Sequence, residues 1–309
     1  MALASIVVPS RGGAARLPAL LSALAAQDDP EWEAIVVIDG DIDDSASVVA
    51  KYSHLAVRSI VFPENRGRVA ALNTGFAEAR GDVLIRCDDD LVPQPDYVRQ
   101  HKMSHAAEPG GSIGLCLNVL PDNAYARIYG READRRFQSG AYETPSSELW
   151  RLWGGNVSTT RDLWSKVGPY DASYRTYGWE DVDWGYRLAR EGVTIRLVRG
   201  AEVLHTGAAA DVWSRVKRAF HSGAARRTFE EVHGSAILSP QAGRRGIWNQ
   251  VVSFSAAHLD RGRLRAASAT VQFFAPILPT YVGHKLVALL VESAAVSGYQ
   301  RPHETRADF

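Results

Sequence analysis

Between Ala4 and Cys87 the sequence alternates between two patterns of apolar residues, one typical of strands and one typical of helices. Short apolar runs predict buried strands at Ala4–Val8 and Ala34–Ile38, and further strands are expected at Ala56–Phe62 and Asp82–Cys87. Apolar residues three and four positions apart predict helices between them, at Arg16–Gln27, Asp44–Tyr52 and Arg68–Arg80. Strands that alternate with helices at this spacing favour a parallel sheet covered on both faces. Because ligands of such sheets bind outside the carboxyl ends of the strands, we expect a functional crevice there.

The composition of the chain excludes several classes of protein. Hydrophobic residues make up 46% of its 309 residues, enough for a sizeable core and too much for a disordered chain. Lys and Arg total 35, as do Asp and Glu, so the strongly basic footprint of a nucleic-acid-binding protein is missing. With only two cysteines, the chain is expected to be cytoplasmic. We see no basic leader at the N-terminus and no apolar run of roughly 18 residues, so we expect a protein that is soluble or peripheral on the inner face of the membrane.

The strongest chemical signal is the run of three carboxylates from Asp88 to Asp90, directly after the fourth expected strand. Adjacent carboxylates repel one another, and a bound cation relieves this repulsion; Mg²⁺ and Mn²⁺ favour oxygen ligands. A metal there could hold a diphosphate and neutralise it as it leaves. The alternative is a solvated acidic turn. Pro9, Arg11 and Asp39 lie at the ends of other expected strands, so we expect them at the same edge.

A second acidic cluster begins the helix expected at Glu180–Arg190. Acids in a first helical turn are favoured by the helix dipole, which is a purely structural explanation. It does not account for Gly178 and Trp179 directly before the Glu180–Asp181 pair. A carboxylate beside an aromatic side chain that binds sugar is what a general base for a sugar hydroxyl needs. Asp181 and Glu180 are therefore candidate catalytic residues.

Two further features are weak when taken alone. His205 follows the apolar run Ala201–Leu204, and a lone histidine in such a place is more often structural than a metal ligand. Trp153 precedes Gly154 and Gly155, whose missing side chains let the backbone approach a ligand closely. An ordinary turn or bulge explains these glycines equally well.

Taken in order, these segments resemble the family 2 glycosyltransferases of the GT-A fold, over about residues 3 to 210. The stretch from Trp153 to Asp183 is similar to the galactosyltransferase-type C-terminal segment of some of these enzymes. The other matching motifs are Ile6–Pro9, Val36–Gly40, Glu64–Gly67, Asn73–Gly75, Ala79–Asp82 and the Asp-any-Asp motif Asp88–Asp90. Ile38 departs from the family, which usually has a second Asp before Gly40. The resemblance implies an α/β fold with a Rossmann-like, mostly parallel sheet flanked by helices.

The resemblance also implies a role for each candidate in an inverting, metal-dependent hexosyltransferase. Asp39 would touch the nucleotide base, Asp88 would face the ribose or the metal, and Asp181 would take the acceptor proton. Asp90 would bind Mn²⁺ or Mg²⁺, and His205 would complete the metal shell. The remaining candidates are Pro9, Arg11, Asn65, Arg68, Asp89 and Gly155 for the donor, and Trp153 and Trp179 for the acceptor. We expect a nucleotide-diphosphate sugar as donor, UDP-sugars first, and a glycan, lipid-linked or small-molecule acceptor.

The chain is expected to divide near residue 210. Residues 1–210 would form the catalytic domain, with a nucleotide-sugar-binding half at 1–120 and an acceptor-binding half at 121–210. Strands are also expected at Ser112–Val119 and Gly154–Thr160. Residues 211–309 would form a helical extension, whose apolar stretch 271–297 is broken by Pro276 and Pro279 and is unlike a membrane span. This tail would pack on the catalytic domain, form a homodimer seam, or make peripheral contact with a membrane.

Two other functions fit part of the pattern. A sugar-phosphate nucleotidyltransferase also uses a strand-end Asp and Mg²⁺, and Ser10–Ala14 is a thin version of its glycine-rich loop. That function gives the Glu180–Asp181 pair no role. A non-catalytic carbohydrate-binding relative is the other alternative, and the intact Asp88, Asp90 and Asp181 argue against it.

Overall fold

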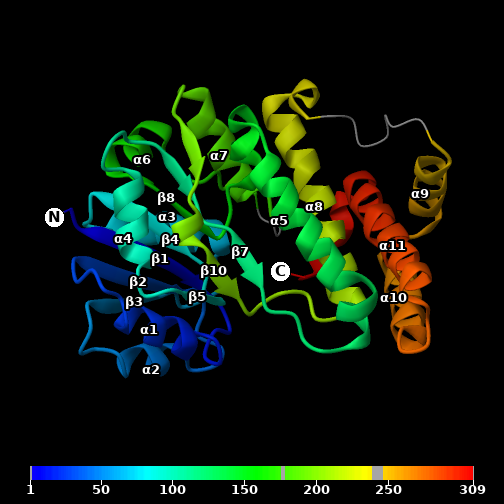
Figure 1. The fold of residues 1–309 in the computed structure, drawn as a ribbon, viewed down its shortest axis with the longest axis horizontal. Helices are drawn as coiled ribbons and strands as arrows, with labels where there is room; N and C mark the ends of the chain where they lie inside the picture. The colour runs from blue at the N-terminus through cyan, green and yellow to red at the C-terminus, as the bar shows by residue number, and fades with distance from the viewer. Residues whose placement is uncertain (1, 175–177, 239–245, 309) are drawn as a thin grey trace. The chain divides into compact units, whose positions relative to one another are not determined.

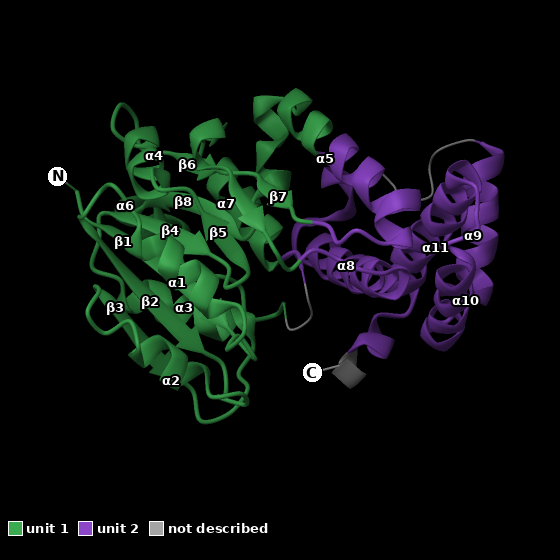
Figure 2. Ribbon diagram, turned by 60° about the horizontal axis from the view of Figure 1, so that its bottom comes forward, with its two compact units in different colours: residues 1–119, 138–175, 180–207 green, residues 120–137, 176–179, 208–309 purple. Residues whose placement is uncertain are grey.

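The computed structural model describes residues 2–174, 178–238 and 246–308. The chain forms two compact units, shown in separate colours in Figure 2. The first comprises residues 1–119, 138–175 and 180–207, and the second comprises residues 120–137, 176–179 and 208–309. Within the described ranges, no helix combines the length and the apolar character needed to cross a membrane.

A sheet with the strand order β3-β2-β1-β4-β8-β6-β9 forms the centre of the first unit (Figure 1). Its strands, in that order, are β3 (Val57–Val61), β2 (Trp32–Ile38), β1 (Ala4–Ser10), β4 (Val83–Cys87), β8 (Asn156–Thr160), β6 (Gly111–Ile113) and β9 (Ile195–Leu197). The first four are parallel neighbours, whereas β8 runs antiparallel to β4 and to β6. The expected α/β fold with a mostly parallel sheet is confirmed.

Helices cover both faces of this sheet, and β1 and β2 near its centre are therefore buried and mostly apolar. Ile6 and Val8 of β1 share a buried cluster with the leucines of α1 (Leu17–Ala25). Val7 points to the opposite face, against α3 (Arg68–Glu78). Gly75 makes this close approach possible, because a Cβ atom there would collide with the side chain of Val7.

The first unit also contains a smaller sheet, with the strand order β5-β10-β7. It consists of β5 (Leu91–Pro93), β10 (Val203–His205) and β7 (Cys116–Asn118). β10 pairs antiparallel with β5 and parallel with β7, so His205 lies opposite both Leu91 and Asn118. The strand expected at Ser112–Val119 is thus two short strands, β6 and β7, in different sheets.

The remaining helices of the first unit flank the two sheets. They are α2 (Ser45–Ala50), α4 (Tyr97–Ser104), η2 (Ser146–Leu152), α6 (Arg161–Val167), α7 (Glu180–Arg190) and η3 (Arg199–Ala201). Helix α5 (Arg131–Glu143) begins in the second unit and ends in the first. Of these helices, α7 matters most for function because both candidate catalytic acids are in its first turn.

The second unit is helical. Its other elements are η1 (Ala126–Gly130), α8 (Val212–His233), η4 (Ser235–Ile237), α9 (Ile247–His258), α10 (Arg261–Phe274), α11 (Thr280–Gln300) and η5 (Pro302–Asp308). Phe220, Leu264, Val287 and Leu290 are part of its buried core. The helical character expected for residues 211–309 is confirmed in the described part, and the segment 120–137 packs with these helices.

Candidate active site

Asp39, directly after β2, holds the loop between β3 and α3 in place. Its buried carboxylate accepts the backbone N–H groups of Arg66 at 2.6 Å and Gly67 at 2.9 Å, and its carbonyl accepts a hydrogen bond from Arg11 at 2.6 Å. The Asn65 amide oxygen also accepts the Gly67 N–H, at 3.1 Å. The structure therefore brings together three of the predicted donor-site residues, Arg11, Asp39 and Asn65. A contact of Asp39 with a nucleotide base stays a prediction.

The side chain of Asp89 is surrounded by other side chains and is largely closed to solvent. Its carboxylate is buried and accepts hydrogen bonds from Ser10 Oγ at 2.6 Å and from Arg16 Nη2 at 2.8 Å. Burial raises the pKa of Asp89, although these two donors act to lower it. Asp89 thus ties the end of β1, where Pro9 lies buried opposite Val37, to the acidic run.

Asp90 lies against His205 across the small sheet. The Asp90 Oδ2 to His205 Nε2 distance is 3.2 Å, and His205 Nδ1 lies 2.7 Å from the amide oxygen of Asn118. Burial opposes the charge of Asp90, yet the contact with His205 brings its pKa below the ordinary value. Gly207 leaves the necessary room, because a Cβ atom there would collide with Asp90 Oδ2.

The donor set of Asp90 and His205 fits a cation. If Nδ1 of His205 donates its proton to Asn118, Nε2 turns a lone pair toward a carboxylate oxygen, and two acceptors then face each other. A proton or a metal ion between them resolves this conflict, and metal-binding histidines commonly donate their other N–H in this way. Across the described residues, however, no group of three His, Cys, Asp or Glu side chains forms a metal cluster. The carboxylate of Asp88 contacts Arg86 rather than Asp90 and His205.

Asp88 belongs to a buried charge cluster centred on Arg86 of β4. Arg86 is the second-last residue of β4. Its side chain is fully buried, and its Nε donates to Asp88 Oδ1 at 2.9 Å. The other guanidinium nitrogens lie 3.8 Å from Glu180 Oε1 and 3.8 Å from Asp181 Oδ2. One guanidinium thus contacts three carboxylates; we call Arg86, Asp88, Glu180 and Asp181 the arginine cluster.

Two predicted donor-site residues border this cluster. Arg68, at the start of α3, lies 3.8 Å from Asp88 and 3.7 Å from Glu180. Gly155 lies directly beside Asp88. Any side chain at this position would crowd the carboxylate, because a Cβ atom there would lie 2.7 Å from Asp88 Oδ2. Glu180 is 1% exposed, and within the described residues neither of its carboxylate oxygens has a hydrogen-bond donor. Its charge is therefore balanced mainly by the two arginines.

The environment of Asp181 raises the proton affinity of its carboxylate. Burial, reinforced by the neighbouring charge of Glu180, raises the pKa of Asp181 to about 7, and Arg86 opposes this shift. A carboxylate with a pKa near neutrality can accept a proton and release it again at physiological pH. The first turn of α7 holds Asp181 there, with the Val182 backbone N–H donating to its Oδ1 at 2.8 Å.

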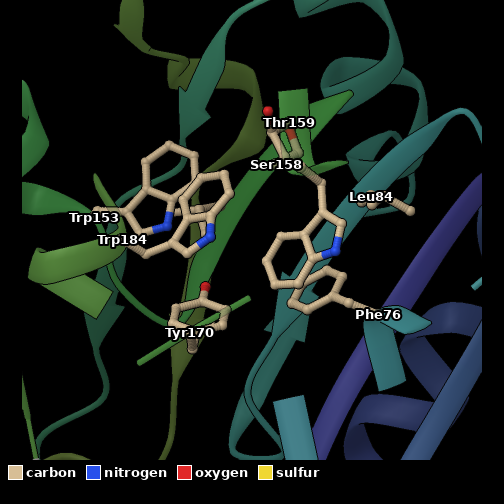
Figure 3. A pocket seen from close by; sticks show the side chains of 9 residues that line it. Phe76, Leu84, Trp153, Ser158, Thr159, Tyr170 and Trp184 are labelled. Carbon is tan, nitrogen blue, oxygen red and sulfur yellow. The ribbon is translucent and has the colours of Figure 1, made fainter. Parts of the chain in front are cut away.

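The two predicted acceptor tryptophans have different surroundings. Trp153 is 3% exposed and stacks on Trp184 with ring centroids 5.1 Å apart (Figure 3). The cavity beside them, which Tyr170 and Phe76 also line, measures about 10 Å³, so it has no room for a sugar. Trp179 lies in the second unit, where its indole N–H donates to Ser222 at 3.0 Å. Sugar stacking by either residue stays a prediction, and Trp153 makes a core contact in the structure.

Sequence reasoning missed three polar residues of the site. Arg86 is a charged residue in an otherwise apolar strand, Val83–Cys87. This exception in the sequence could have identified it as a site residue. Arg16 and Asn118 had no comparable signal, because their roles depend on partners more than 70 residues away, at Asp89 and His205.

Comparison with known proteins agrees with this geometry. The family model described as Glycosyl transferase family 2 matches residues 5–158, and the model described as N-terminal domain of galactosyltransferase matches residues 135–208. Among solved structures, a mannosyltransferase of Pyrobaculum calidifontis in complex with GDP-Man and Mn²⁺ superposes with a TM-score of 0.63 at 17% identity, covering 97% of this chain and 88% of that chain.

Two curated relatives resemble the chain in sequence. Validoxylamine A glucosyltransferase of Streptomyces hygroscopicus subsp. jinggangensis is 29% identical over 66% of this chain and 56% of its own length. YwdF of Bacillus subtilis, named as an uncharacterized glycosyltransferase, is 33% identical over 65% of this chain and 73% of its own length. The chain thus spans little more than half of the validoxylamine enzyme.

The sheet, the acidic residues at its carboxyl edge and the superposition define a protein of the GT-A class. Within that class, the chain belongs to glycosyltransferase family 2.

Replacing Arg86 by methionine is expected to lower the free energy of unfolding by about 3–5 kcal/mol, because three carboxylates would lose their shared buried cation. Urea unfolding measures this change. The control is Arg131→Met, which breaks an exposed ion pair with Asp122 and is expected to cost about 1 kcal/mol or less. Equal losses in the two variants would show that the cluster does not depend on Arg86.

Proposed function

We propose that the chain is an inverting glycosyltransferase that moves a sugar from a nucleotide-diphosphate sugar to an acceptor hydroxyl, with a divalent metal. The observation that carries this proposal is the arginine cluster. It joins Asp88, at the end of β4, to the Glu180–Asp181 pair at the start of α7. A strand-end acid and a carboxylate with a pKa of about 7 are thereby held on one guanidinium.

In the proposed reaction, the Asp181 carboxylate accepts the proton of the acceptor hydroxyl. The acceptor oxygen forms a bond to the anomeric carbon on one face of the sugar. The bond from that carbon to the diphosphate breaks on the other face, and the nucleoside diphosphate leaves with the bonding electrons. Attack and departure on opposite faces invert the anomeric configuration. Glu180 keeps the pKa of Asp181 high enough for proton transfer, and Arg86 keeps the carboxylate in place.

Asp90 and His205 are the residues that would hold Mn²⁺ or Mg²⁺, with Asn118 fixing the orientation of the imidazole. A divalent ion there would neutralise charge on the departing diphosphate. Support comes from the facing acceptors described above and from the GDP-Man and Mn²⁺ bound in the mannosyltransferase of the same fold. We infer that Arg11, Asp39, Asn65 and Arg68 take part in donor binding, with UDP-sugars as first candidates.

The acceptor is proposed to be a glycan, a lipid-linked sugar or a small molecule, and the validoxylamine A glucosyltransferase relative supports glycosyl transfer in general. A nucleotidyltransferase is less well supported. Such an enzyme would give Glu180 and Asp181 no function, whereas both acids are built into the arginine cluster.

Nucleoside diphosphate binding is expected to depend on the metal. Chelation with EDTA should weaken binding by about 10- to 100-fold in calorimetry, the range typical for loss of a metal-site contact. Asp90→Asn should bind with the same affinity in the presence and absence of EDTA, because it lacks the anionic ligand. Equal affinity of the unmodified enzyme in both conditions would contradict the metal site.

Asp181→Asn is expected to lower kcat by about 10²- to 10⁴-fold, because the amide keeps the shape of the side chain but cannot accept the proton. Nucleoside diphosphate affinity should be unchanged. Asp162→Asn is the matched control, since Asp162 is an exposed acid in the first turn of another helix, α6. Near-normal turnover of Asp181→Asn would place the base elsewhere, with Glu180 the next candidate.

A further inference from the structure

The helices α9, α10 and α11 of the second unit carry an unusual number of exposed apolar side chains. Val287, Leu290 and Val291 account for part of the apolar C-terminal sequence, because they are buried in the core of this unit. Other apolar side chains nearby are not buried: Phe273, on α10, is 77% exposed, and Ile277, in the turn between α10 and α11, is 78% exposed. We call the following residues the apolar patch: Ile247, Phe254, Phe273, Phe274, Ile277 and Tyr281. An exposed cluster of this kind in a folded protein usually marks an interaction surface.

Ring contacts join some members of this patch to their neighbours. Phe273 and Phe274 lie edge to face at the end of α10, with centroids 5.1 Å apart. The Lys285 ammonium lies 5.0 Å from the ring of Trp248, on α9, and 5.8 Å from the ring of Tyr281, on α11. Lys285 therefore joins the beginning of α9 to the beginning of α11, and α10 packs beside α11 (Figure 1).

The segment that carries most of the patch is basic, and the acids that flank it, Asp260 and Glu292, contact Arg263 and Trp248. Between Arg261 and Val291 the sequence contains no Asp or Glu. Arg263, Arg265 and Lys285 are exposed within this stretch. Because the whole chain carries equal numbers of basic and acidic residues, this basic character is local to α10 and the first half of α11.

We propose that the apolar patch binds the surface of an anionic lipid membrane. Exposed aromatic and aliphatic side chains would enter the interface between head groups and acyl chains, while Lys285 and the two arginines attract the lipid phosphates. A second copy of the chain fits less well, because a symmetric dimer through this patch would bring the same basic side chains close to each other. The attachment is peripheral, since no described helix can cross a membrane.

Co-sedimentation of the full chain with vesicles tests this proposal. The protein is expected to pellet with vesicles that contain about 30% phosphatidylglycerol at low salt, and to be released at high salt as the charge attraction is screened. Ile277→Ser combined with Phe273→Ser should weaken binding at least roughly tenfold through lost apolar burial. Lys285→Glu should weaken it about 10- to 30-fold, and only for anionic vesicles.

Met103→Ser is the matched control, because Met103 is 60% exposed but lies on α4 of the first unit. It should bind vesicles as the unmodified chain does, and the urea unfolding of all variants checks their folding. Three outcomes would overturn the proposal: protein that stays in the supernatant at low salt, equal binding to purely zwitterionic vesicles, or a stable dimer that becomes monomeric in the patch variants.

Discussion

The buried guanidinium of Arg86 is the positive charge that three carboxylates share. It lies inside the central sheet on β4, and the carboxylates of Asp88, Glu180 and Asp181 surround it. Removal of these charges from water costs several kcal/mol for each ion, and their mutual attraction offsets that cost only while all partners are present. The end of β4 and the first turn of α7 are therefore held together, and the proton affinity of Asp181 is set by the same contacts.

Much of this arrangement could be predicted from the sequence, because it follows from local patterns. Mostly apolar runs predicted the parallel strands β1 to β4 to within two residues of their ends. The pattern is clearest in β1 and β2, which are buried on both faces, whereas β3 is partly exposed. The carboxyl-edge rule then brought Arg11, Asp39 and Asp88 to one side of the sheet. The helix at Glu180 was equally clear, because acids favour a first helical turn.

The parts that could not be predicted depend on contacts distant in sequence. Nothing in Asn156–Thr160 shows that β8 pairs antiparallel with β4, and nothing around Cys116 shows that the chain changes sheets there. The meeting of His205 with Asp90 depends on the pairing of two short strands of the second sheet, β5 and β10. Trp153 shows that residue type alone does not separate the two roles, because a tryptophan suited to stacking on a sugar is equally suited to packing on Trp184.

The pH dependence of kcat/KM, measured for the unmodified enzyme and for Glu180→Gln, tests most directly whether Asp181 is the base. Burial and the charge of Glu180 raise the pKa of Asp181 to about 7, so activity should fall as the pH drops through that region and protonates the base. Glu180→Gln removes a negative charge and keeps the shape of the side chain. The pKa of Asp181 should therefore decrease, and the acidic limb of the profile should move to lower pH. An acidic limb that stays in place, or that moves to higher pH, would contradict the assignment of Asp181.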